Sequence, residues 1–157
     1  MNRLSHPIPW LACLSIVLVI GAACAPLATP PPPTSAPASS ITNIVWQWAS
    51  VTNRPTGETT EVTDPQSYTI IFRDDGTVTG QADCNTFTGT YSQEGGFAIT
   101  AIPDVMAACG GDSLDQQYLE LLGAIAAGGP DGAGGLALET AGGEQRMEFV
   151  DGGSAAK

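Results

Sequence analysis

The clearest alternation of apolar and polar side chains runs from residue 68 to residue 73. Two sets of side chains alternate there, Tyr68, Ile70 and Phe72 on one side of an extended backbone and Thr69, Ile71 and Arg73 on the other. Asp75-Gly76 follows directly, a dipeptide that hairpin turns favour. The pattern predicts a strand, a turn and one or two further strands up to Tyr91. We expect the rest of the domain to be organised around this central hairpin.

A second alternating segment precedes the hairpin. Residues 44–51, IVWQWASV, place Trp46 and Trp48 on the same side of a predicted strand. Two tryptophans on one face either fill the core or form an exposed platform for a ligand, and packing in the core is the simpler expectation. Residues 53–66 contain Pro55, Gly57 and Pro65, which predicts a loop or an irregular edge.

Further strands are expected after the central hairpin. Residues 97–101 follow a turn at Gly95-Gly96 and end before Pro103-Asp104. Four apolar side chains then alternate with polar neighbours on either side of Gly142-Gly143: Leu136, Leu138, Met147 and Phe149. This last pattern predicts a closing hairpin that completes an antiparallel sheet.

One helix is expected between these strands. Ser113 and Gln116 have the spacing of a capping box, so the helix should begin at Ser113. Apolar side chains then repeat at steps of three and four: Leu114, Tyr118, Leu121, Leu122 and Ile125. The sequence Gly128-Gly129-Pro130 should end the helix, and residues 131–135 should form a loop. Strands with a single amphipathic helix predict an α+β domain.

The first 23 residues have the features of an export signal. Arg3 precedes an apolar run from Trp10 to Ile20, which is shorter than the ~20 residues of a membrane-spanning helix. The sequence GAAC ending at Cys24 resembles a bacterial lipobox, although Gly21 stands where a large aliphatic residue is usual. That resemblance implies lipidation of Cys24 and a membrane anchor, on the periplasmic or cell-surface face of the envelope. Ordinary secretory cleavage near Ala23 is the alternative.

The chain divides into four parts on these grounds: a signal peptide at 1–23, a lipidated cysteine and tether at 24–40, a folded domain at 41–151, and a disordered tail at 152–157. The segment 25–40 consists mainly of Pro, Ala, Ser and Thr, and it cannot bury enough apolar surface to fold. Its four consecutive prolines favour an extended backbone of ~3.1 Å per residue. The segment could therefore hold the domain a few tens of ångströms from a surface.

Acidic side chains outnumber basic ones by sixteen to five, which gives a formal net charge of −11 at pH 7. Removal of the signal takes away Arg3 and leaves four basic against sixteen acidic side chains, a net charge of −12. Such a surface repels phosphate backbones, so nucleic acid is not an expected partner.

The sequence offers few side chains that could act in catalysis or bind a metal. The single histidine, His6, lies in the signal, so the exported chain has no imidazole for a catalytic triad or for zinc. Asp74, Asp75 and Asp83 are the nearest carboxylates to a glycosidase-like pair, but Asp74-Asp75 precedes Gly76 in a turn, where aspartate serves local hydrogen bonds. We expect no catalytic residue, no metal and no cofactor.

Two cysteines remain in the predicted domain, Cys84 and Cys109. In an oxidising compartment a disulfide is the expected state, ahead of a metal pair or a redox centre. It would connect the central hairpin to the segment before the helix.

The sequence GQADCNTFTGTY resembles the GxCNxFxGxY signature of the META domain, the HslJ-like family of small exported or envelope proteins. The matching residues are Asp83, Cys84, Asn85, Phe87, Gly89 and Tyr91, and Ala82-Asp83 stands before the cysteine where glycine is frequent. Segments around Cys109 and at 113–122, 136–140 and 146–150 match in the same order. The resemblance implies a curled, barrel-like, mostly antiparallel sheet packed against one helix, in proteins associated with envelopes and stress.

The sequence leaves several functions open. The first is a non-catalytic, lipid-tethered envelope module that binds an unknown partner. The second is a carrier of a small apolar ligand inside the curled sheet, with Trp46, Trp48, Phe87 and Tyr91 near the pocket. The third is a carboxylate enzyme, or an inhibitor of a basic secreted enzyme such as lysozyme.

Overall fold

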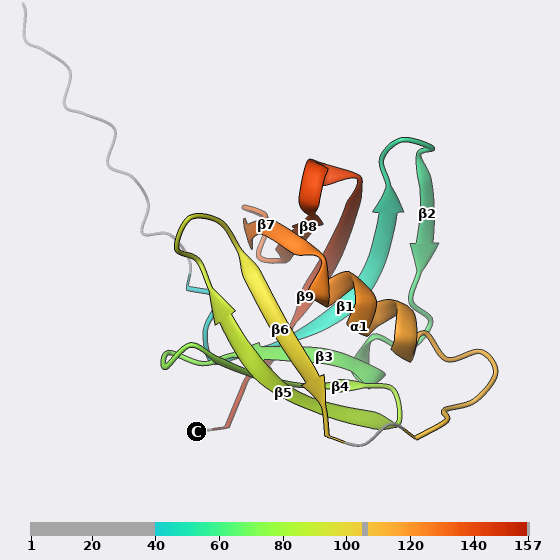
Figure 1. Cartoon of the computed structure of the whole chain (residues 1–157), viewed down its shortest axis with the longest axis horizontal. Coiled ribbons are helices and arrows are strands. Elements are labelled where there is room, and N and C mark those ends of the chain that lie inside the picture. Colours follow the sequence, from blue (N-terminus) through green and yellow to red (C-terminus); the bar gives the residue numbers. More distant parts are fainter. Residues whose placement is uncertain (1–39, 105–106, 157) are drawn as a thin grey trace, which may run out of the picture. The chain divides into compact units, whose positions relative to one another are not determined.

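The computed structural model describes residues 40–104 and 107–156 (Figure 1). The predicted signal peptide, Cys24 and most of the predicted tether lie outside the described residues. One α-helix, two short 3-10 helices and nine strands form the described part: β1 Ile44–Asn53, β2 Glu58–Glu61, η1 Pro65–Ser67, β3 Tyr68–Phe72, β4 Thr77–Ala82, β5 Asn85–Ser92, β6 Ala98–Pro103, α1 Asp115–Gly123, β7 Ile125–Pro130, β8 Leu136–Thr140, η2 Ala141–Gly143 and β9 Gln145–Ser154.

The strands form one sheet in the order β6-β5-β4-β3-β1-β9-β8-β7, with antiparallel neighbours, and β2 pairs with the end of β1. The sheet curls until its two outer strands approach each other, and the N–H of Phe97 donates to the carbonyl of Ala126 across the gap (2.9 Å). Helix α1 packs against β6 and β4 at the remaining opening (Figure 1). The predicted class, a curled antiparallel sheet packed against one helix, is confirmed.

The central hairpin is formed by β3 and β4. Tyr68, Ile70 and Phe72 point into the core, and Asp75-Gly76 lies in the connecting turn. The predicted alternation therefore assigns the buried face of β3 correctly, because an antiparallel strand with one face on a core repeats every two residues.

The helix is shorter than the sequence pattern predicts. It begins at Asp115, and the hydroxyl of Ser113 accepts from the N–H of Asp115 (3.2 Å) instead of forming the capping box with Gln116. It ends at Gly123, not at Gly128, and residues 125–130 form strand β7. Pairing with β8 satisfies the backbone of this segment, and a Cβ at Gly128 would lie 2.9 Å from the carbonyl oxygen of Ala137. Pairing with β8 thus decides the structure of this segment against the helical spacing of its apolar residues. Ile125 is buried, as predicted, but it belongs to a strand.

The C-terminal strand is longer than expected. The prediction of a disordered tail from residue 152 is wrong, because β9 continues to Ser154, whose partner is Ile44. The N–H of Ala155 donates to the carbonyl of Asn43 (2.9 Å), and the Arg73 guanidinium donates to the carbonyl of Ala156 (2.8 Å). Backbone pairing, which side-chain patterns do not report, holds this glycine-rich segment in the sheet. Likewise, the expected loop at 53–66 contains strand β2, paired with β1.

Candidate functional site

The family-type motif begins at the turn between β4 and β5. Asp83 has a positive φ of 55°, a left-handed conformation that glycine adopts freely and that aspartate tolerates better than most residues. Cys84 follows and forms a disulfide with Cys109, with 5.7 Å between the Cα atoms. The predicted pairing of these two cysteines is present.

Asn85 connects the sheet to the segment before the helix. Its side chain is 2% exposed, and its Oδ1 accepts from the N–H of Ala107 (2.8 Å). Its Nδ2 lies within hydrogen-bond distance of the carbonyl of Ala107 (3.1 Å), Cys109 Sγ (3.3 Å) and Asp115 Oδ2 (3.1 Å). Asn85 therefore fixes residues 107–109 and the start of α1 beside the disulfide. The motif in the sequence marked this residue, but its partners could be found only from the structure.

The remaining motif residues shape the sheet. The Phe87 ring is buried over Gly80, where a Cβ would lie 2.3 Å from the ring. A Cβ at Gly89 would lie 1.8 Å from the carbonyl oxygen of Thr100. The hydroxyl of Tyr91 donates to the carbonyl of Arg73 (3.0 Å), which ties β5 to the central hairpin. These contacts hold the framework together.

Aromatic side chains fill the space inside the curled sheet. Tyr118, on α1, stacks on Trp48 with 5.1 Å between ring centroids and meets Tyr68 edge to face at 5.8 Å. Trp46, Trp48 and Phe87 are each at most 3% exposed, so three of the four aromatics considered as ligand-facing belong to the core. Tyr91, the fourth, is half-buried against Phe72 and Phe97.

The candidate carboxylates do not form a pair. Asp75 Oδ1 accepts from the hydroxyl (2.6 Å) and the N–H (2.9 Å) of Thr77, and these bonds lower the pKa of Asp75 below its usual value. Asp74 accepts from the Asn43 amide (2.8 Å). Asp83 lies at the other end of β4, ~20 Å along the strand. Asp74 and Asp75 therefore make the local turn contacts expected from the sequence.

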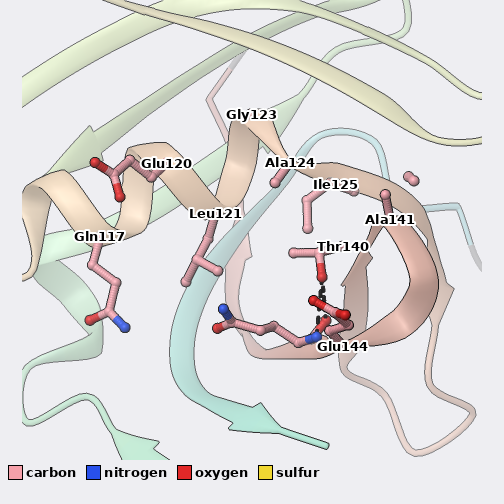
Figure 2. Close-up of a pocket in the computed structure, with 11 residues that line it drawn as sticks. Gln117, Glu120, Leu121, Gly123, Ala124, Ile125, Thr140, Ala141 and Glu144 are labelled. Atoms are coloured by element: carbon pink, nitrogen blue, oxygen red, sulfur yellow. Dashed lines mark hydrogen bonds between the residues drawn. The ribbon is translucent and has the colours of Figure 1, made fainter. Parts of the chain in front are cut away.

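A groove lies at the C-terminal end of α1 (Figure 2). This groove has a volume of about 720 Å³. Helix α1, the start of β7 and the η2 turn line it with Gln117, Glu120, Leu121, Gly123, Ala124, Ile125, Ala126, Thr140, Ala141, Glu144 and Gln145. In Figure 2, Gln117 and Leu121 extend from α1 toward the groove, Thr140 and Glu144 lie across from them, and Glu120 extends in another direction.

Hydrogen bonds between its walls hold the groove in shape. The N–H of Ala141 donates to the carbonyl of Ala124 (3.1 Å), which joins the η2 turn to the end of the helix. The N–H of Gln145 donates to the hydroxyl of Thr140 (3.1 Å), and the N–H of Arg54 donates to the carbonyl of Glu144 (2.8 Å). The position of Glu144 is therefore set by the backbone of two neighbouring segments.

The groove is acidic and has no basic lining residue. Glu120 and Glu144 are its two charged residues. The arginines of the described residues are engaged elsewhere: Arg54 pairs with Glu139, Arg146 with Glu139 (2.9 Å) and Glu148 (3.1 Å), and Arg73 binds the carbonyl of Ala156. The bonds to Glu148 and Glu139 raise the pKa of Arg146 above its usual value. The carboxylates of the groove are thus left without an internal counter-charge among its lining residues.

Comparison with known proteins shows which solved structures share this fold and which family the chain belongs to. The fold is shared with two solved structures, a protein from Burkholderia xenovorans (TM-score 0.57, 19% identity, 71% of this chain and 83% of that chain) and a DUF4847 family protein from Bacteroides vulgatus (TM-score 0.52, 16% identity, 70% and 93%). The META domain model matches residues 39–152, and the chain therefore belongs to the META domain family. No curated protein matches the sequence. In the described part of the chain, no helix has the length and apolar character needed to cross a membrane.

Proposed function

We propose that this protein is a non-catalytic module of the cell envelope, anchored to a membrane through lipid on Cys24 and acting by binding a partner at its outer surface. The lipobox-like sequence before Cys24 and the proline-rich segment that follows support the anchor. The folded domain would then lie at the end of a tether, a few tens of ångströms from the membrane.

The observation that carries the binding mode is the filled interior of the sheet. Trp48, Tyr68 and Phe87 pack around Tyr118, and Trp46 is 3% exposed. Tyr91 packs against Phe72 and Phe97. A carrier would need an open apolar cavity of several hundred Å³. The filled core therefore favours the outer surface over an internal ligand.

The charge of the domain favours a basic secreted protein as the partner. The described arginines bind groups of the protein itself, so the excess of carboxylates remains available to a cationic surface. Opposite charge accelerates encounter and selects partners. A basic secreted enzyme such as lysozyme fits this description, and its inhibition is the second candidate function.

Two measurements test the proposal. Mass spectrometry of the N-terminal peptide of the native protein should show a lipid adduct on Cys24, and Cys24→Ser should move the protein from the membrane to the soluble fraction. Lysozyme should bind the full chain with an affinity that falls as salt rises from 50 to 300 mM, because screening weakens exposed charge contacts. Lysozyme with succinylated amines is the control. An unmodified Cys24 would refute the anchor, and equal binding of the two lysozymes would refute charge-selected recognition.

A further inference from the structure

We propose that the groove at the C-terminal end of α1 receives an arginine or lysine side chain of the basic protein partner. This inference rests on the proposed function and assigns its contact site. It follows from the shape of the groove, from the chemistry of its lining and from the direction of the helix.

The lining suits a long side chain with a charged end. Leu121 and Ile125, each 5% exposed, and the small residues Ala124 and Ala141 form the apolar part of the lining. Arginine and lysine bury their methylene stems on apolar surface while the cationic head stays near polar groups. A volume of about 720 Å³ is ample for one such side chain with bound water.

The electrostatics of the groove select a cation. Helix α1 ends here, and the C-terminal end of a helix carries a partial negative charge from its last carbonyl groups. Glu144 lies across the groove from the helix, whereas the side chain of Glu120, also a lining residue, extends in another direction. Gln117 and Gln145 offer amide oxygens as further acceptors. The side-chain charges and the helix end thus favour the same sign of ligand.

The groove is also formed before a partner binds. The bonds between Ala141 and Ala124, and between Thr140 and Gln145, already join its walls. A preformed site avoids part of the entropic cost of ordering on association. The nearby arginine, Arg54, is paired with Glu139 and does not line the groove.

The test uses two matched pairs of variants in the full chain, with lysozyme as the probe and isothermal titration calorimetry as the measurement. Ala141→Arg puts a cation in the groove, and Ala133→Arg makes the same charge change in the exposed loop at the far end of β7. Glu144→Gln removes a groove carboxylate, and Asp112→Asn removes an exposed carboxylate near the other end of α1. Near-ultraviolet circular dichroism confirms that each variant is folded.

Ala141→Arg should weaken lysozyme binding by about tenfold or more, because like charges at a contact are strongly unfavourable. Glu144→Gln should weaken it about two- to fivefold, the range of an exposed ion pair. Each control should change affinity by less than its partner variant. Equal losses within each pair would mean diffuse attraction and would overturn the groove as the site while leaving the proposed function in place. Absence of lysozyme binding to the unaltered chain would overturn both the groove as the site and the proposed recognition of a basic secreted enzyme.

Discussion

Tyr118 gives the sharpest test of the packing described above, because its hydroxyl is buried and has no hydrogen-bond partner among the described residues. The side chain is fully buried among Trp48, Tyr68 and Phe87, and burial raises the pKa of Tyr118 well above its usual value. An unsatisfied buried hydroxyl costs ~1–3 kcal/mol. Tyr118→Phe removes the hydroxyl and keeps the ring.

We therefore expect Tyr118→Phe to raise the free energy of unfolding by about 1 kcal/mol or more, which corresponds to a Tm increase of ~3–6 °C for a domain of this size. Tyr68→Phe is the matched control, because the Tyr68 hydroxyl accepts from the N–H of Leu114 (2.9 Å). Its loss should lower stability by ~1–2 kcal/mol. Urea denaturation followed by tryptophan fluorescence measures both changes.

A decrease in stability for Tyr118→Phe would refute the reasoning, since it would mean that the hydroxyl has a partner such as a buried water.

Tyr118 also affects how the stability of the domain depends on pH in alkaline solution. The raised pKa keeps Tyr118 neutral in the folded state, while an unfolded tyrosine loses its proton near pH 10. The part of the free energy of unfolding that is linked to this proton is thus complete below pH 10 and is lost as the pH rises further. The decline of stability above pH 10 should therefore be shallower in Tyr118→Phe.

Three further changes test the framework. Reduction of the Cys84–Cys109 disulfide, or Cys84→Ser with Cys109→Ser, should lower stability by ~3–4 kcal/mol, because the bond closes a loop with a sequence separation of 25, and thiol titration before and after unfolding verifies its state. Asn85→Ala should cost ~2–3 kcal/mol in urea denaturation, since it removes the acceptor of the Ala107 N–H and the Nδ2 donor to Asp115 Oδ2, while the Ser113 hydroxyl still donates to Asp115 Oδ1. Gly89→Ala should destabilise by ~2 kcal/mol or more because its Cβ would meet the Thr100 carbonyl, whereas Gly123→Ala, with open space around its Cβ, should be neutral or slightly stabilising in thermal melts.

The sequence predicted the elements whose side chains alternate against the core. The alternation of Tyr68, Ile70 and Phe72 is a direct record of which face of β3 is buried, and the burial of Trp46 and Trp48 follows the same rule. Strand β7 was missed because its sequence, Ile-Ala-Ala-Gly-Gly-Pro, has no alternation and continues the helical spacing of Leu121 and Leu122. Its pairing with β8 is a tertiary property, as is the pairing of Ser154 with Ile44.

The groove was also beyond sequence reasoning. Its walls come from α1, β7 and η2. In the sequence Glu144 is an ordinary turn residue, and only the folded structure places it beside the end of the helix. The motif around Asn85 was visible in the sequence, but it indicated a framework contact. Aromatic content suggested an internal pocket, and only the packing around Tyr118 shows that these rings are used in the core.

Hydrogen exchange of the full chain with and without saturating lysozyme tests the central claim most directly, because it reports where a partner contacts the domain. The account predicts slower amide exchange confined to residues 117–126 and 140–145, with no change in the core strands around Trp48. Protection confined to other surfaces, or unchanged exchange in both groove segments, would contradict it.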